Sequence, residues 1–350
     1  MKFTLKTQLR ALALLFVLFS CEDSGNEKPL GAYETGVLIL NEGAFGANDG
    51  EVFHVDPETG ELKRNVFETE NGRPFAGLLE DVVLVDERLY LVANTGKVEI
   101  VNSFDFKSSG AVVGDLDQPR SLDIAEGKLF ISDYGPYEAD FSTPNSYIAI
   151  VAGLDGGSIK KKIQVSNKPE DLFAKGNFVW VAGSEESKVE VIDARTESVV
   201  KTLEVKGQPT QFFEKDGDLW LYSYDSEKVY FQSFRLDNFT LKNLKEFGLP
   251  SATSRMAIGS DNRIYILTSS GWPDYRDAVA IVNFNDNSFV ADWNKGSGFY
   301  GIGFDSERNE LYVANSKGFQ GNGEVVIYSE EGFELRKIEA GRGPSGFMFR

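Results

Sequence analysis

Short segments in which apolar and polar residues alternate recur along the chain from residue 36 to the C-terminus. One type of segment carries an aromatic residue or a leucine near its centre, and its seven copies begin at Gly36, Arg88, Lys128, Phe178, Asp218, Arg263 and Glu310. The central residues of successive copies are 40 to 52 positions apart. Alternation with a period of two is typical of half-buried β-strands, and a repeat of about 45 residues is typical of β-propeller blades.

Each copy has the same neighbours along the chain. A strand-like segment precedes it and often begins with proline, as at Pro119, Pro169 and Pro209. A second alternating segment follows it, as at residues 97–102 and 188–193. A turn that contains Asp, Thr or Gly then leads to a fourth segment. Four strands per repeat make one propeller blade.

The two ends of the repeat region are complementary. The first repeat lacks the innermost strand, and the chain ends with such a strand, at residues 344–350, that has no blade after it. We therefore expect the C-terminal strand to complete the first blade and close the ring, which leaves no open sheet edge. The sequence predicts an all-β, seven-bladed β-propeller over residues 36–350, with four antiparallel strands per blade.

The first 35 residues have a different pattern. Three positively charged residues precede an uninterrupted apolar run at residues 11–19, which is too short to span a membrane and is typical of a secretory signal. The sequence that ends at Cys21 resembles a bacterial lipobox, in which the cysteine becomes the lipidated first residue. We predict a lipoprotein signal peptide at residues 1–20, followed by a lipidated Cys21 and a flexible tether at residues 21–35.

Composition narrows the possible functions. The formal net charge of −18 argues against a nucleic-acid partner, because phosphate binding needs a basic face. The chain has one histidine and one cysteine, so most metal clusters and catalytic triads are difficult to build. His54 lies on a predicted strand and is expected to be structural. Residues 341–346 match G-x-G-x-x-G, but no helix is predicted after them, so they are not expected to bind a dinucleotide.

Four of the loops between the second and third strands of a blade are long, at residues 43–50, 134–146, 271–277 and 317–323. In a propeller these loops share one face with the segments that lead into the next blade, and long loops on a fixed scaffold commonly carry a binding site. Aromatic residues on this face predict a broad platform for a large flat ligand. The candidate ligand-binding residues are Phe45, Phe75, Arg120, Tyr134, Tyr137, Phe141, Trp272, Tyr275, Tyr300 and Phe319.

Arginines add positive charge to the same face of an otherwise acidic protein. They are Arg73, Arg120, Arg255 and Arg276. Each one alone has the alternative of a surface salt bridge, but as a group they would suit an anionic or amide-bearing ligand.

Two other classes of function stay open. The second strands of several blades end in polar residues, and if these point into the central channel they would hold a hard cation such as calcium, as in propeller lactonases. The residues are Asn41, Glu42, Asp133 and Asn315. Such a site would support a cation-dependent hydrolase or lyase, although Asn and Asp also end strands because they favour turns. A propeller face can also serve as a protein-interaction scaffold in the cell envelope.

The repeats resemble a known family of propellers. Residues 311–315, with the sequence LYVAN, and residues 188–209 resemble the YVTN-type propeller repeat, and the likeness extends over residues 36–350. Residues 37–62, in which Leu40-Asn41-Glu42-Gly43 precedes a loop rich in Gly and Asn, resemble the opening blade of surface lipoprotein propellers of Bacteroidetes. That group includes the cell-surface cobalamin-binding lipoproteins of corrinoid uptake systems.

This resemblance implies a function and a location. It implies a non-catalytic protein, with no cofactor of its own, that captures cobalamin or a related corrinoid on one propeller face. The ligand would then pass to a TonB-dependent outer-membrane transporter. The acidic pair Glu22-Asp23 after the cysteine resembles the export signal of such lipoproteins, which implies a lipid anchor in the outer membrane with the protein facing the cell exterior.

Overall fold

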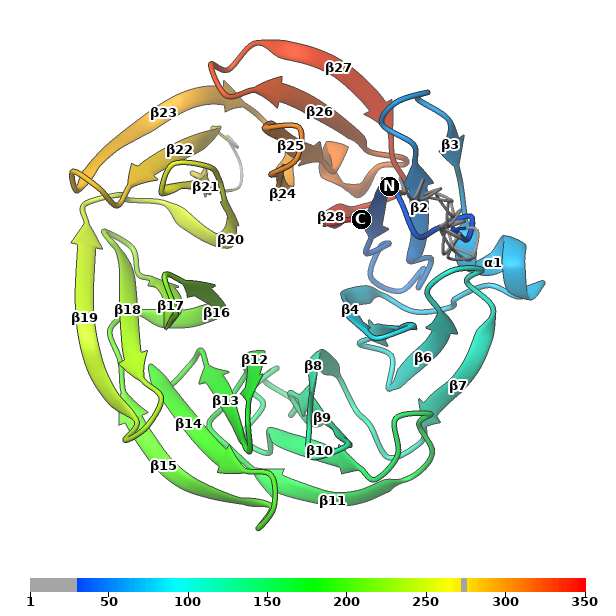
Figure 1. Cartoon of the computed structure of the whole chain (residues 1–350), viewed down its shortest axis with the longest axis vertical. Coiled ribbons are helices and arrows are strands. Elements are labelled where there is room, and N and C mark those ends of the chain that lie inside the picture. Colours follow the sequence, from blue (N-terminus) through cyan, green and yellow to red (C-terminus); the bar gives the residue numbers. More distant parts are fainter. Residues whose placement is uncertain (1–29, 272–275) are drawn as a thin grey trace, which may run out of the picture.

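Seven four-stranded antiparallel sheets are arranged in a ring around a central channel (Figure 1). The structure is a computed structural model, and it describes residues 30–271 and 276–350. The seven-bladed β-propeller predicted from the sequence is therefore confirmed, with four strands in each blade. The predicted lipidation site, Cys21, and the predicted signal peptide lie outside the described residues.

Within each blade the strands follow one another from the channel outward. From innermost to outermost, blade 1 comprises β28 (Pro344–Phe349), β1 (Val37–Asn41), β2 (Glu51–Val55) and β3 (Leu62–Lys63); blade 2 comprises β4 (Leu79–Val85), β5 (Arg88–Ala93), β6 (Lys97–Asn102) and β7 (Ser108–Val113). Blade 3 comprises β8 (Pro119–Ala125), β9 (Lys128–Asp133), β10 (Tyr147–Val151) and β11 (Ile159–Gln164); blade 4 comprises β12 (Pro169–Lys175), β13 (Phe178–Gly183), β14 (Lys188–Asp193) and β15 (Ser198–Glu204).

The remaining three blades follow the same order. Blade 5 comprises β16 (Gln208–Lys215), β17 (Asp218–Tyr224), β18 (Val229–Arg235) and β19 (Thr240–Phe247); blade 6 comprises β20 (Ala252–Ile258), β21 (Arg263–Ser269), β22 (Asp277–Asn283) and β23 (Ser288–Gly296). Blade 7 comprises β24 (Phe299–Asp305), β25 (Glu310–Asn315), β26 (Glu324–Ser329) and β27 (Glu334–Glu339). The described part of the chain also contains two short helices, α1 (Val66–Asn71) and η1 (Lys317–Phe319), in connections between strands.

The hydrophobic core is divided among the interfaces between blades. Each of the seven clusters of buried side chains draws on two neighbouring blades, such as Trp180 of blade 4 with Phe234 of blade 5. The second and third strands are buried on both faces, whereas an outermost strand such as β15 is mostly exposed. Alternation in the sequence therefore weakens toward the middle of each blade, where both sides of the strand face apolar neighbours.

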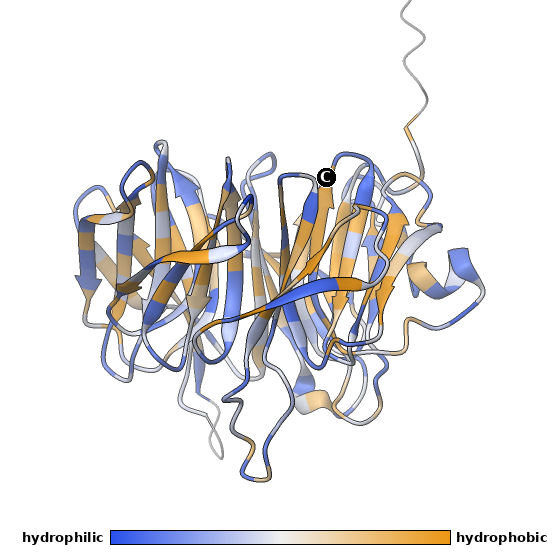
Figure 2. Ribbon diagram, turned by 90° about the horizontal axis from the view of Figure 1, so that it is seen from below, coloured by the Kyte–Doolittle hydropathy of each residue, from blue (hydrophilic) through white to orange (hydrophobic). Residues whose placement is uncertain are grey.

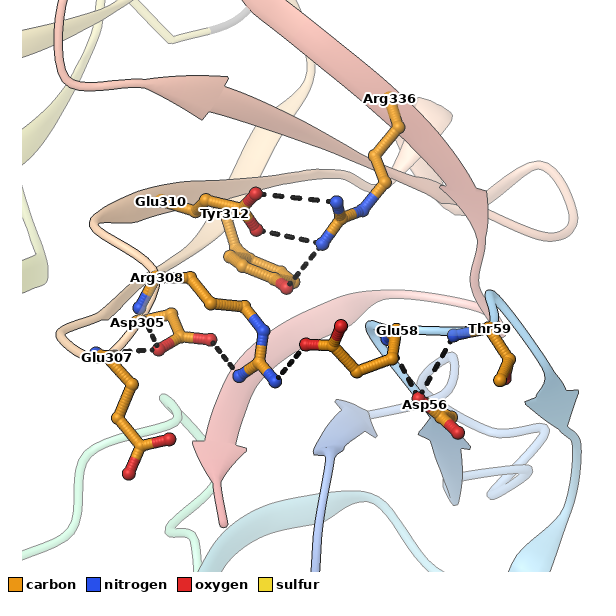
Figure 3. A network of polar contacts seen from close by, with 9 residues as sticks. All are labelled: Asp56, Glu58, Thr59, Asp305, Glu307, Arg308, Glu310, Tyr312 and Arg336. Carbon is orange, nitrogen blue, oxygen red and sulfur yellow. Dashed lines mark hydrogen bonds and ion pairs between the residues drawn. The ribbon is translucent and has the colours of Figure 1, made fainter.

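The last strand of the chain closes the ring. β28 pairs with β1 in antiparallel register, with Ile39 opposite Phe347, and the backbones of Gly36 and Arg350 exchange hydrogen bonds of 2.9 and 2.8 Å. This pairing confirms the predicted closure. Figure 3 shows a second link between the last and first blades, in which Arg308 of blade 7 contacts Asp305 at 3.2 Å and Glu58 of blade 1 at 2.9 Å.

Residues 31–35, the last part of the predicted tether, pack against the propeller. The Tyr33 side chain is 4% exposed, and its hydroxyl donates to Glu70 at 2.6 Å. Arg350 Nη1 donates to the Tyr33 carbonyl at 2.7 Å, and the Thr35 carbonyl lies 2.7 Å from His54 Nε2. Burial lowers the pKa of His54. The histidine therefore has the structural role expected from the sequence, in which it fixes the entry of the chain.

The long loops lie on the opposite face from this entry. The connections β1–β2, β9–β10, β21–β22 and β25–β26 all leave the same end of their blades and are longer than the corresponding connections in blades 2, 4 and 5. Figure 2 shows loops projecting at the bottom of the disc and the C-terminus at the top. Among the described residues, no helix combines the length and apolar character needed to cross a membrane.

Candidate functional site

A row of charged side chains lines the central channel near the loop face. Glu80, Arg120 and Glu170 are the second residues of the innermost strands β4, β8 and β12, and all three line a cavity of about 400 Å³. Arg120 Nη1 lies 2.6 Å from Glu80 Oε1, and its Nη2 lies 3.9 Å from Glu170 Oε2. Burial raises the pKa of Glu80 to about 7, although the neighbouring Arg120 opposes this shift. Arg120 thus provides the positive charge between two acidic neighbours.

A pair of aspartates lies one residue further along the same strands. Ser121 Oγ is 3.0 Å from Asp81 Oδ2 and 3.3 Å from Asp171 Oδ1. Burial raises the pKa of Asp171 to about 7, and it also raises the pKa of Asp81. A hydroxyl has one proton to donate, so the second contact needs a proton on a carboxyl group, which agrees with the raised pKa values. Asp171 also accepts the Phe212 N–H at 2.7 Å and so joins blade 4 to blade 5.

A larger cavity of about 830 Å³ lies between blades 6 and 7 on the loop face. We refer to this cavity as the blade 6–7 cleft. Its aromatic wall includes Tyr300 and Phe319, whose ring centroids are 4.9 Å apart with the planes at 80°. The Arg255 guanidinium lies 5.5 Å from the centroid of Tyr300, and the Tyr300 hydroxyl donates to Glu42. Arg120 and Arg255 line both cavities, so the cleft and the channel meet at these two arginines.

The structure brings three of the predicted ligand-binding residues together. Arg120, Tyr300 and Phe319 line the blade 6–7 cleft. Tyr134 is instead buried beside the channel, where its ring centroid lies 4.9 Å from the Arg120 guanidinium and its hydroxyl donates to Glu170. Tyr134 therefore fixes the positions of Arg120 and Glu170 in the channel wall.

The other predicted aromatic residues lie elsewhere. Phe75 is 1% exposed and packs on Phe67 in the core. Phe45 is 91% exposed, and Tyr137 and Phe141 form an exposed pair with centroids 6.2 Å apart. None of these four predicted residues lines the cleft. The predicted residues Trp272 and Tyr275 lie outside the described residues.

The residues considered for a cation site hold loops in place. Asp133 is buried and accepts backbone N–H groups from Asp117, Gln118 and Gly135 at 2.7 to 2.9 Å. Asn41 is also buried, and it accepts the Gly341 N–H at 2.7 Å. Hydrogen bonds therefore occupy the oxygens that a cation would need.

The remaining two candidates make similar contacts. Glu42 accepts the Tyr300 hydroxyl, and Asn315 donates to the Ser297 carbonyl at 2.8 Å and accepts the Lys317 N–H at 2.8 Å. Within residues 30–271 and 276–350, no group of three or more His, Cys, Asp or Glu side chains is placed to hold a metal ion.

The acidic residues of the channel were not predicted from the sequence. The second and third positions of the innermost strands β4 and β12 hold Glu80, Asp81, Glu170 and Asp171. From the sequence, these strands were used only to predict the number of blades. The position of these residues on innermost strands could have identified them, because an innermost strand of a propeller faces the central channel. Polar residues on such a strand have a different environment from polar residues on an exposed outer strand.

The fold and the two cavities define the class of this protein as a seven-bladed β-propeller with a charged channel that joins a cleft on its loop face. The chain belongs to the family described as "Domain of unknown function (DUF5074)", whose model matches residues 35–349. No curated protein matches the chain.

Solved structures with the same fold include proteins of different kinds. A quinonprotein alcohol dehydrogenase-like protein from Bacteroides thetaiotaomicron is 16% identical with a TM-score of 0.66, and the match covers 91% of this chain and 78% of that one. A functionally unknown protein from Desulfotomaculum acetoxidans is 10% identical with a TM-score of 0.64, covering 90% and 98%. BamB from Moraxella catarrhalis is 14% identical with a TM-score of 0.51, covering 91% and 88%. At these identities the likeness shows the fold alone.

Proposed function

We propose that this protein is a non-catalytic binding protein that takes a bulky ligand into the blade 6–7 cleft, and that the ligand is cobalamin or a related corrinoid. The observation that carries the proposal is the cleft itself. Its volume of about 830 Å³ is within the range of small-molecule sites, and it has an aromatic wall at Tyr300 and Phe319.

The surroundings of the cleft support a binding role. The β25–β26 loop, one of the four long loops, supplies Phe319, while the innermost strands β20 and β24 supply Arg255 and Tyr300. A long loop beside a rigid strand framework is a common arrangement for recognition. A flat macrocycle would pack against the half-buried rings of Tyr300 and Phe319, and the nearby Arg255 would orient polar groups at the periphery of the macrocycle.

The proposed location follows from the N-terminal sequence. The lipobox-like segment at Cys21 and the acidic pair after it support a lipid anchor in the outer membrane with the propeller outside the cell. In that location the protein would deliver its ligand to a TonB-dependent outer-membrane transporter. Protease treatment of intact cells tests this part, because digestion of the propeller without cell lysis is expected, and protection of the propeller would contradict surface display.

Calorimetric titration of the purified full-length chain in detergent with cyanocobalamin tests the ligand, with heme as the control compound. We expect one-to-one binding of cyanocobalamin and none of heme. Phe319→Ala should weaken binding by roughly tenfold, since truncation of an anchoring aromatic typically costs about 1–2 kcal/mol or more. Phe333→Ala is the matched control, because Phe333 is 71% exposed in the β26–β27 turn on the opposite face. Equal affinities for all three proteins would exclude the cleft, and no binding at all would exclude the corrinoid.

A further inference from the structure

A residue in the wall of the blade 6–7 cleft has a buried carboxylate oxygen for which residues 30–271 and 276–350 supply no hydrogen-bond donor. Asp277 begins β22 and is 3% exposed. Its Oδ2 accepts the Phe299 N–H at 2.9 Å, whereas its Oδ1 has no partner among the described residues. Buried acceptors in native proteins are nearly always satisfied, so an unsatisfied one beside a cavity needs an explanation.

The same wall carries the guanidinium of Arg255, whose charge acts to lower the pKa of Glu80 in the channel without a direct ion pair between them. In the part of the chain that the structure describes, Arg255 makes no ion pair, and its guanidinium lies over the face of Tyr300 at 5.5 Å. The other cations near the cleft are occupied, since Arg120 contacts Glu80 at 2.6 Å and Lys317 contacts Glu324 at 2.9 Å. Arg255 is therefore the cation of this wall that remains available to a ligand.

These two groups have opposite hydrogen-bonding roles. A carboxylate oxygen accepts hydrogen bonds, and a guanidinium only donates them. Both residues line the one cavity, together with the aromatic side chains of Phe299, Tyr300 and Phe319. The charges of Asp277 and Arg255 are opposite, so a ligand that is itself net neutral, with a donor and an acceptor, matches the cleft better than a simple anion or cation.

We propose that the blade 6–7 cleft recognises a ligand group that gives an N–H donor to the Asp277 carboxylate and an oxygen acceptor to Arg255. Two sources share this chemistry, a primary carboxamide and an ammonium–carboxylate zwitterion. This inference rests on the ligand-binding function proposed above for the same cleft. It adds which polar groups of the ligand are recognised and which two side chains recognise them.

The test uses three small compounds that each carry one aromatic ring for the cleft wall. Benzamide presents a carboxamide, free phenylalanine presents a zwitterion, and benzoate presents an acceptor without an N–H donor. Ligand-observed NMR with the full-length chain in detergent measures their affinities. We expect benzamide or phenylalanine to bind more tightly than benzoate, and the tighter of the two identifies the source.

Two variants connect this preference to the residues. The Asp277→Asn side chain can keep an oxygen for the Phe299 N–H and present an amide N–H₂ in place of the other oxygen. The affinity for the preferred compound should therefore fall by roughly tenfold, and the affinity for benzoate should rise relative to it. Arg255→Met should lower the affinity for all three compounds, because each of them has an oxygen acceptor. Asp261→Asn and Arg195→Met are matched controls, because both residues are exposed and neither lines the cleft. Arg255→Met also keeps the test decisive if Asp277→Asn fails to fold.

The outcomes separate this inference from the corrinoid proposal. Preference for benzoate, absence of binding by every compound, or unchanged affinity in both variants would overturn the recognition of a donor–acceptor group. If benzamide or phenylalanine binds as expected but cyanocobalamin does not, this inference stands and the corrinoid proposal fails. If cyanocobalamin binds wild type and Asp277→Asn equally, and the small compounds do not bind, the corrinoid proposal stands and this inference fails.

Discussion

The guanidinium of Arg120 lies 2.6 Å from the carboxylate of Glu80 in the wall of the central channel, where the two side chains are 24% and 5% exposed. Asn94 donates a further hydrogen bond to the same Glu80 oxygen at 2.6 Å. The pair joins the innermost strands of blades 2 and 3, so its loss should affect both the stability of the ring and the charge of the channel.

Replacement of Arg120 by methionine should lower the free energy of unfolding by about 3 kcal/mol at pH 8, because Glu80 is left buried without its counter-ion. At pH 5 the loss should be smaller, since the Glu80 carboxyl is then neutral. Chemical denaturation at the two pH values measures both quantities. The double variant Arg120→Met/Glu80→Gln should recover most of the loss, and equal loss in the single and double variants would contradict an interaction between the two side chains.

The protein should become less stable as pH rises from about 4.5 to about 7. Burial raises the pKa of Glu51 from 4.5 to about 7, even though its carboxylate accepts the N–H groups of Phe67 and Glu68 at the start of α1. A folded-state pKa above the unfolded value gives stability that is fully present below the unfolded pKa and is lost as pH rises through the folded pKa.

Glu51→Gln should therefore reduce the slope of unfolding free energy against pH across this window. Urea denaturation at intervals between about pH 4.5 and pH 8 measures the slope. Phe45→Ala is the control, because Phe45 is 91% exposed and carries no titratable group, so this substitution should leave the slope as in wild type. A slope that Glu51→Gln does not change would show that other carboxyl groups carry the pH dependence.

The packed segment before β1 should contribute to stability. Tyr33→Ala removes a buried ring from the core between blades 1 and 2, and should cost about 3 kcal/mol. Tyr33→Phe keeps the ring and removes only the hydrogen bond to Glu70, so it should cost about 1 kcal/mol. Thermal denaturation distinguishes the two substitutions. If both variants unfold at the wild-type temperature, the segment is not part of the folded unit in solution.

Asp133 should act on loop structure rather than through a cation. Asp133→Asn removes one of the two carboxylate oxygens that hold Asp117, Gln118 and Gly135, and should cost about 2 kcal/mol because a buried N–H is left unpaired. Addition of EDTA to the wild-type protein should leave its Tm unchanged. A fall in Tm with EDTA that calcium reverses would instead restore the cation site considered from the sequence.

The sequence predicted the architecture of this protein more fully than its candidate site. Blade count and ring closure depend on strand periodicity and on the spare strand at residues 344–350, and both are local features of the sequence. The cleft depends on which side chains of different blades meet. Phe75 and Tyr134 are aromatic, as residues that bind flat ligands often are. However, Phe75 lies in the core and the buried Tyr134 packs against Arg120.

Contacts between blades also explain what was missed. One carboxylate oxygen of Asp277 accepts a hydrogen bond from Phe299 of the next blade, and its other oxygen is buried without a partner among the described residues. Nothing in the residues around it in the sequence indicates that pairing. The same holds for two of the arginines predicted to lie on the loop face. Arg73 forms a bidentate pair with Glu99 at 2.8 Å, whereas Arg255 lines the cleft, and only the three-dimensional surroundings distinguish them.

The entry of the chain at Tyr33, on the face away from the long loops, sets the direction in which the protein can be presented. If the N-terminal end is held at a membrane, the flat base of the disc faces the lipid and the blade 6–7 cleft opens toward the medium. Such an orientation favours capture over transfer, because a receiver embedded in the same membrane lies on the wrong side of the disc. Release to such a receiver would then require the whole propeller to turn about its attachment near Tyr33, so this rotation would limit the rate of handover as much as the affinity of the cleft.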